Sequence, residues 1–170
     1  MVSTARRIEL VPAEETERRA RRDCAKEPEL WALLDAVTDP EIPVLSLWDL
    51  GVLQNIERVG HRILVTLTPT YSGCPALIAM QEDIRARLAE AGLTDVDIVQ
   101  VLSPAWSSQW LSSAAREKLT AYGIAPPGDE RCPHCGSSHT HRVAEFGSTA
   151  CKAMWRCDDC LEPFDQFKAF

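Results

Sequence analysis

The chain has 170 residues, of which 45% are hydrophobic, which suffices for one modest core and a small appended module. Its formal net charge of −7 offers no positive footprint for a polyanion, so nucleic acid and anionic membrane surfaces are disfavoured as partners. No signal-peptide pattern follows the N-terminal arginines, and no apolar run is long enough to span a membrane. We therefore expect a cytoplasmic protein whose 7 cysteines are reduced thiols.

The N-terminal part of the chain divides at Pro28. Residues 1–27 mix arginines and glutamates with little apolar periodicity, which predicts a solvated, partly helical arm. From Pro28 onward, apolar residues recur at helical spacing behind a proline that suits a helix start. The sequence predicts a helix to about Val37, because the residue before Pro40 is pushed out of the α region.

The middle of the chain alternates strand and helix patterns. Residues 52–59 and 61–68 flank Gly60 and predict a β-hairpin. Apolar residues then step by three or four from Leu77 to Ala91, which predicts a helix ended by Gly92. Residues 95–102 predict a further strand, and this order favours a right-handed crossover onto a parallel strand pair. One or two short helices are expected in residues 106–122.

A proline-rich breaker, Pro126-Pro127-Gly128, follows these elements and marks a domain boundary. The sequence thus predicts four segments: an arm (1–27), an α/β domain (28–123), a linker (124–129) and a cysteine-rich module (130–170).

The cysteine-rich module contains two Cys-x2-Cys pairs, formed by Cys132, Cys135, Cys157 and Cys160. Four thiolates suit a tetrahedral structural zinc ion, although iron in a rubredoxin-like site uses the same ligands. The paired spacing disfavours unrelated free thiols. The near balance of basic and acidic groups in the module favours a protein-docking or stabilising role over nucleic-acid binding. Its aromatic side chains are expected to pack the hairpin, with docking of a partner as the alternative.

Cys74 is the candidate reactive residue of the α/β domain. It precedes Pro75 at a helix start, where the helix dipole is expected to lower the pKa of a thiol. The alternative is a small buried residue that closes a turn. Asp39 and Glu41 could supply oxygen ligands or hydrogen bonds beside Cys74 if their loop folds over that turn, although such carboxylates are more often turn and cap residues.

The histidines and Cys151 decide which further reactions or metal contacts are expected. No histidine stands out as a base for Cys74, so covalent catalysis, including thioesterase activity, is disfavoured. Cys151 lies outside both cysteine pairs and is expected to be either a further contact for an incoming metal or a packed hairpin residue.

A resemblance to the MIP18 (DUF59) family lies in two motifs of the α/β domain. These are Asp-Pro-Glu-Ile-Pro-Val-Leu-Ser-Leu-Trp-Asp-Leu-Gly-Val-Leu at residues 39–53 and Thr-Pro-Thr-Tyr-Ser-Gly-Cys-Pro at residues 68–75. Two tail motifs, Phe-Gly-Ser-Thr-Ala-Cys-Lys-Ala at 146–153 and Glu-Pro-Phe-Asp-Gln-Phe-Lys at 162–168, extend the resemblance to the family of D components of the bacterial phenylacetyl-CoA epoxidase system. The implied fold is an α/β (α+β) domain with a mixed sheet and flanking helices, followed by a zinc ribbon.

The resemblance also implies a function. MIP18-like proteins are associated with iron–sulfur cluster assembly, and the family's cysteine and acidic motif fall on Cys74, Asp39 and Glu41. We expect a non-catalytic maturation factor with a structural zinc ion, in which these residues and Cys151 transiently bind iron or a cluster for the epoxidase reductase. The alternative is a structural or regulatory subunit that binds the oxygenase through the ribbon and handles no labile metal. A monomer and a homodimer both stay open.

Overall fold

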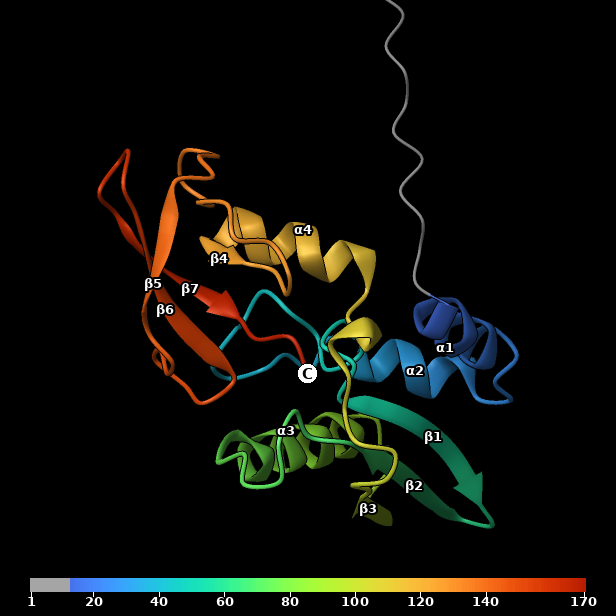
Figure 1. Ribbon diagram of the computed structural model, residues 1–170. Helices are drawn as coiled ribbons and strands as arrows, with labels where there is room; N and C mark the ends of the chain where they lie inside the picture. The colour runs from blue at the N-terminus through green and yellow to red at the C-terminus, as the bar shows by residue number, and fades with distance from the viewer. Residues whose placement is uncertain (1–12) are drawn as a thin grey trace, which may run out of the picture.

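The computed structural model describes residues 13–170, and its elements are shown in Figure 1. In chain order they are α1 (Ala13–Asp23), α2 (Pro28–Leu34), β1 (Leu53–Val59), β2 (Arg62–Leu67), α3 (Ala76–Glu90), β3 (Val96–Gln100), the 3-10 helix η1 (Ser108–Trp110), α4 (Ser113–Tyr122), β4 (Ile124–Ala125), β5 (Thr140–Ala144), β6 (Lys152–Cys157) and β7 (Pro163–Phe167). None of the helices among these described residues is both long and apolar enough to cross a membrane.

The first sheet is mixed and has the strand order β1-β2-β3. Strands β1 and β2 form the expected antiparallel hairpin around Gly60, whose φ of +66° lies in the left-handed region that favours glycine. Helix α3 is the crossover that returns the chain to β3, parallel to β2. Alternating side chains of β2, among them Ile63 and Val65, are buried in the core together with Ile84 and Leu88 of α3. The hairpin and the parallel pair are therefore confirmed.

The helix predicted for residues 28–37 ends earlier than expected. Helix α2 stops at Leu34, and Val37 continues only as a turn whose N–H donates to the Leu34 carbonyl oxygen at 3.1 Å. Thr38 then forms an isolated antiparallel bridge with Ser46. The loop 35–52 folds back on itself through this bridge. The helix therefore ends several residues before Pro40, whose ring restricts only the residue that precedes it.

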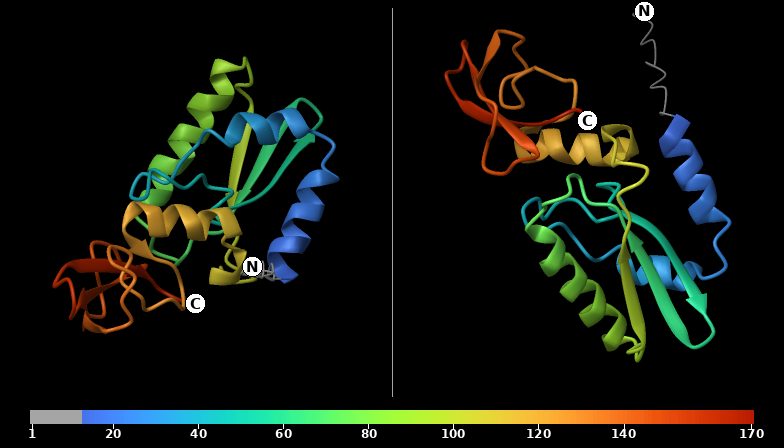
Figure 2. Two further views of the ribbon diagram at one scale, coloured as in Figure 1. Left: turned by 90° about the horizontal axis from the view of Figure 1, so that it is seen from above. Right: turned by 60° about the horizontal axis from the view of Figure 1, so that its bottom comes forward.

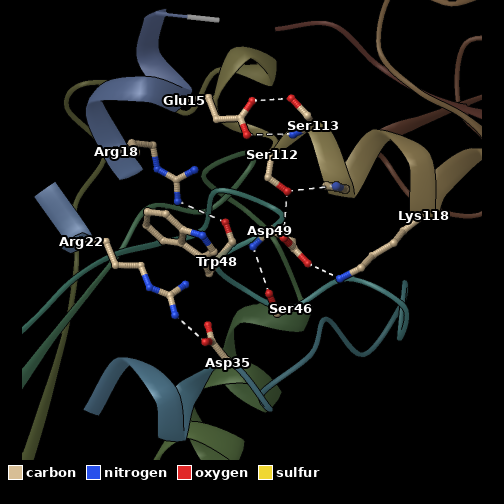
Figure 3. Close-up of polar contacts among 11 residues, drawn as sticks. Glu15, Arg18, Arg22, Asp35, Ser46, Trp48, Asp49, Ser112, Ser113 and Lys118 are labelled. Atoms are coloured by element: carbon tan, nitrogen blue, oxygen red, sulfur yellow. Dashed lines mark hydrogen bonds and ion pairs between the residues drawn. The ribbon is translucent and has the colours of Figure 1, made fainter. Parts of the chain in front are cut away.

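The N-terminal segment, described from residue 13, is helical as predicted, but it is not wholly solvated. Helix α1 lies against the α/β domain (Figures 1 and 3), and its Arg18 side chain is buried. The guanidinium donates to the carbonyl oxygens of Trp110, Trp48 (3.2 Å) and Leu53 (3.2 Å) and lies 4.1 Å from the centre of the Trp48 ring. Burial lowers the pKa of Arg18 to about 10, so it stays protonated at neutral pH.

A second buried charge of α1 holds the start of α4. The Glu15 carboxylate accepts hydrogen bonds from the Ser113 backbone N–H and hydroxyl, both at 2.9 Å (Figure 3). Ser112 caps α4 by accepting from the Ala115 N–H and donates its hydroxyl to Asp49. Acceptors at a helix N-terminus satisfy N–H groups that have no partner within the helix. Helix α1 is thus part of the folded domain.

The C-terminal sheet has the strand order β4-β7-β6-β5. Strand β4 pairs in parallel with β7, so residues 124 and 125, expected to lie in the linker, belong to the ribbon sheet. The core of the ribbon is small and consists of Ala125, Cys132, Ala153, Trp155, Cys157 and Phe164. Trp155 and Phe164 stack within it with their ring centres 6.5 Å apart, as expected for side chains that pack the hairpin.

The ribbon is packed onto the α/β domain. Cys151 and Phe167, both from the ribbon, belong to the main core cluster. The end of the chain comes back toward the segment before α4 (Figures 1 and 2), where the rings of Phe167 and Phe170 lie 5.8 and 6.0 Å from that of Trp106. The two parts therefore share one interior surface.

Candidate metal sites

The first candidate site lies at the tip of the ribbon, where the four paired cysteines meet. The sulfur atoms of Cys132, Cys135, Cys157 and Cys160 all lie within 4.8 Å of one another. The Cys132–Cys160 and Cys135–Cys157 sulfur pairs are 3.7 and 3.6 Å apart. A tetrahedral zinc ion with bonds of about 2.3 Å requires sulfur separations of about 3.8 Å. The four side chains therefore fit a zinc ion.

Each cysteine pair is followed by a residue in the left-handed backbone conformation, which reverses the direction of the chain. Gly136 follows the first pair with a φ of +77°, and its N–H donates to the Cys132 carbonyl oxygen at 2.8 Å. Leu161 occupies the matching position after the second pair with a φ of +67°. A leucine in this region is strained, at a cost on the order of 1 kcal/mol. A glycine after a Cys-x2-Cys pair indicates such a turn in the sequence, whereas a leucine at the same place does not.

Within the second pair, the fold favours the thiolate of Cys157, whereas burial and the neighbouring sulfur atoms raise the pKa of Cys160 to about 12. The Cys160 N–H donates to the Cys157 sulfur at 3.5 Å, and this contact is the main cause that lowers the pKa of Cys157 to about 7. A thiol with a lowered pKa loses its proton readily when a metal ion binds. Cys157 is therefore the cysteine of the cluster that most readily supplies a thiolate ligand.

The second candidate site is a small cavity between the α/β domain and the ribbon, hereafter the interdomain cavity. Its volume is about 10 Å³, close to the minimum for one water molecule. Its lining consists of Asp39, Glu41, Ile42, Leu50, Val52, Pro69, Thr70, Cys74, Met80, Cys151 and Phe167. The cavity thus brings together Asp39, Glu41, Cys74 and Cys151, the four residues proposed from the sequence as iron or cluster contacts.

The expected low pKa of Cys74 is wrong. The residue lies in the turn before α3 as predicted, and the Ala76 N–H acts in the expected direction. Burial outweighs it, however, and the nearby Glu41 and Asp39 carboxylates act with burial to raise the pKa of the thiol. Cys74 is therefore protonated at neutral pH in the absence of a cation.

The two carboxylates of the cavity differ in how they are held. Asp39 is 5% exposed, and its Oδ1 atom accepts hydrogen bonds of 2.8 Å from the backbone N–H groups of both Glu41 and Ile42. Burial nevertheless raises the pKa of Asp39. The Glu41 side chain accepts no hydrogen bond and forms no ion pair within residues 13–170. Asp39 thus shapes the loop, whereas the Glu41 carboxylate is uncommitted.

The ribbon contributes one thiol and one charge to this region. The Cys151 sulfur is buried and lies 3.0 Å from the Thr149 hydroxyl oxygen, and burial raises its pKa. Lys152, the next residue, is 4% exposed, and its ammonium lies 3.4 Å from Asp165. Its positive charge opposes the rise in pKa of Asp39, Glu41 and Cys151. Sequence reasoning missed Lys152, since a lysine at the start of a strand gives no sign of burial.

The two sites differ in how ready they are to bind metal. The ribbon cysteines are the one group of three or more histidine, cysteine or acidic residues in the described part of the chain whose ligand atoms are clustered at metal-binding spacing. The thiols and carboxylates of the interdomain cavity line a common space without that clustering. Metal binding there requires side chains to move.

Asp39 provides a test of loop stability. Asp39→Ala is expected to lower the free energy of unfolding by about 2 kcal/mol, because the buried Ile42 N–H and the partly buried Glu41 N–H lose their acceptor. Asp39→Asn keeps an acceptor oxygen and is expected to cost much less. Chemical denaturation at pH 7 measures both changes, and equal losses for the two variants would contradict the assigned role.

Wild type and Asp39→Asn are also expected to differ in how their stability depends on pH. The pKa of Asp39 is raised in the folded state above its ordinary 3.8, so the folded protein holds this proton more tightly. Wild-type stability should therefore fall relative to Asp39→Asn as the pH rises from 3.8 through the folded-state pKa. Denaturation curves at pH 3.5 and pH 7 measure the difference.

Comparison with known proteins assigns both parts of the chain. Residues 27–101 match a family model described as "Iron-sulfur cluster assembly protein", and residues 124–168 match the "PaaD zinc beta ribbon domain". Over 150 residues the chain is 48% identical to the putative D component of the 1,2-phenylacetyl-CoA epoxidase of Escherichia coli K12, covering 82% of this chain and 91% of that protein. The chain belongs to this PaaD family. The family resemblance drawn from the motifs is therefore confirmed.

Two shorter proteins match the α/β domain. An Fe-S protein maturation auxiliary factor of Porphyromonas gingivalis is 34% identical over 96 residues, which cover 55% of this chain and 90% of that protein. The crystal structure of a DUF59 domain from Bacillus anthracis superposes with a TM-score of 0.51 and 25% identity, covering 61% of this chain and 95% of the other. The α/β domain therefore has the DUF59 fold, and the PaaD family adds the ribbon.

Proposed function

We propose that this protein is a non-catalytic accessory factor that binds iron transiently in the interdomain cavity and delivers it to the iron–sulfur centre of a phenylacetyl-CoA epoxidase system. The ribbon holds a structural zinc ion. The names of two relatives support this proposal, since one is a putative epoxidase component and the other an Fe-S maturation auxiliary factor. The reductase component is the proposed client, because it is the part of such a system that carries a cluster.

The observation that carries the proposal is the convergence of Cys74 and Cys151 on one cavity. They are 77 positions apart in the sequence, one before α3 and the other before β6, and the carboxylates of Asp39 and Glu41 line the same space. Two thiolates with the Asp39 carboxylate make a mixed ligand set that ferrous iron accepts. A half-buried Cys74 and a buried Cys151 that served packing alone would have no need of ionisable neighbours.

The volume of the cavity bears on what it carries. About 10 Å³ admits one water-sized species, so a single ion fits this conformation and a cluster does not. Binding of a cluster would require the ribbon to shift away from Cys74. In the conformation that the structure shows, the proposed cargo is therefore a single ferrous ion.

A second function is favoured by the surface of the ribbon. Phe146 and Leu161 are 64% and 60% exposed, which suits contact with another protein. Under this alternative the protein is a structural or regulatory subunit that binds the epoxidase complex through the ribbon, and Cys74 only packs.

Anaerobic metal analysis of wild type and Cys74→Ala separates the two functions. After loading with ferrous iron and removal of excess, we expect wild type to hold about one zinc per chain plus iron, and Cys74→Ala to keep the zinc and lose the iron. Cys24→Ala, at an exposed thiol after α1, is the matched control and should behave as wild type. Equal iron in all three proteins, together with full epoxidase maturation in cells carrying Cys74→Ala, would exclude the iron-delivery function.

A further inference from the structure

The closed interdomain cavity has an open neighbour. A groove of about 430 Å³ lies between the end of α4 and strands β4, β6 and β7. Its lining consists of Glu41, Tyr122, Gly123, Ile124, Lys152, Met154, Pro163, Phe164 and Asp165. Glu41 is the residue that lines both this groove and the interdomain cavity. Glu41 therefore lies where the open groove meets the cavity that holds the half-buried Cys74 and the buried Cys151.

The groove contains a second carboxylate, which is already engaged. Asp165 pairs with the Lys152 ammonium at 3.4 Å and accepts a hydrogen bond of 2.9 Å from the Ser148 hydroxyl. Glu41 has no such partner among residues 13–170. A cation that enters the groove thus meets one carboxylate that is not held by a neighbour.

The two carboxylates of the Asp39-Pro40-Glu41 loop therefore differ in how freely they can move. The Asp39 carboxylate accepts from two backbone N–H groups, so turning it would break both hydrogen bonds. Glu41 is half-exposed and borders both spaces. A rotation about its side-chain bonds can change the side on which the carboxylate lies while the backbone stays in place.

We propose that Glu41 is the carrier through which a divalent metal ion passes between the open groove and the thiols of Cys74 and Cys151. This inference rests on the proposed function, because it requires metal to bind in the interdomain cavity. The Glu41 carboxylate binds the ion in the groove, turns inward, and yields it as the thiols bind and release their protons to solvent. The ion keeps its charge, and no electron is transferred. The reverse path serves delivery.

Stopped-flow mixing with Co²⁺ tests the carrier role. The full chain, anaerobic and with its ribbon loaded with zinc, is mixed with cobalt, and the thiolate-to-cobalt absorbance is followed; the trace of Cys74→Ser is subtracted. Release is timed by adding a chelator. The informative variant is Glu41→Gln, which keeps the shape and loses the charge. Glu57→Gln, at an exposed position of β1, is the matched control for loss of one negative charge.

We expect Glu41→Gln to slow association about tenfold, and to slow release by a similar factor, because a carrier acts on both directions. The affinity and the final absorbance should then change little. Raised ionic strength should slow wild type more than Glu41→Gln, since the lost carboxylate is the attracting charge. Glu57→Gln should match wild type.

Two results would overturn the carrier role. One is an association rate of Glu41→Gln equal to that of Glu57→Gln. The other is slow association with unchanged release, so that affinity falls in proportion, which would make Glu41 a resident ligand. A wild-type protein that gives no Cys74-dependent absorbance would instead overturn the proposed function itself, and the inference with it.

Discussion

Cys157→Ser is expected to release the zinc ion and unfold the ribbon. The core of the ribbon holds two aromatic side chains and two alanines besides its cysteines, which is too little to offset the entropy of ordering the module. Zinc contributes on the order of 10 kcal/mol to the folding of small modules of this kind. A serine at this position removes the ligand whose pKa is lowered to about 7.

The effect should extend beyond the ribbon. Phe167 and Cys151 are part of the main core, so an unfolded ribbon leaves their sites in the α/β domain uncovered. We expect zinc analysis to show loss of the metal and hydrogen exchange to show loss of protection in β5, β6 and β7, with a lower Tm for the remaining domain. Cys24→Ser, at an exposed cysteine, is the control. A protected ribbon in zinc-free Cys157→Ser would contradict the assignment.

Arg18→Met is expected to lower the free energy of unfolding by about 3 kcal/mol. The substitution keeps most of the apolar stem but removes the donor to three carbonyl oxygens, which belong to Trp48, Leu53 and Trp110. The Trp48 carbonyl oxygen keeps the Gly51 N–H as a donor at 3.0 Å. A buried carbonyl group left without a donor costs about 1–3 kcal/mol, and relief from burying the guanidinium offsets part of the loss. The contact with the Trp48 ring is lost as well.

Urea denaturation measures this loss, and α1 itself provides the matched control. Arg19 lies one residue further on, is 51% exposed, and pairs at 2.5 Å with the buried Glu15 carboxylate, which also accepts two hydrogen bonds from Ser113. Arg19→Met should cost no more than about 1 kcal/mol, because the arginine is largely solvated and the carboxylate keeps its hydrogen bonds from Ser113. If both variants lost the same stability, the effect would reflect the helix in general, and the buried network of Arg18 would be of no special importance.

Much of the fold is encoded in local patterns. The alternation in residues 61–68 and the spacing from Leu77 to Ala91 predicted β2 and α3, because burial on one side imposes a period of two on a strand and 3.6 on a helix. The spacing of Cys132, Cys135, Cys157 and Cys160 predicted a cluster for the same kind of reason: each pair can meet a shared ion only if it forms a tight turn.

The candidate iron site was only partly predictable. The motifs brought Cys74, Asp39, Glu41 and Cys151 to attention, but their common cavity depends on how the ribbon packs on the α/β domain. The pKa of Cys74 was predicted in the wrong direction. The position before a helix is visible in the sequence, whereas burial and the two nearby carboxylates, which outweigh it, are set by contacts between distant segments.

The sequence by itself determined the hairpin, the crossover helix and the paired cysteines of the ribbon, because each follows from residues close together along the chain. Only the tertiary structure decided that the arginine-rich arm contributes a buried Arg18, that Lys152 lies beside the cavity, and that Glu41 borders two spaces. From sequence alone, charged residues are predicted to be exposed to solvent, because burying a charge is usually unfavourable. Which of them is buried depends on partners that packing alone brings within hydrogen-bonding distance.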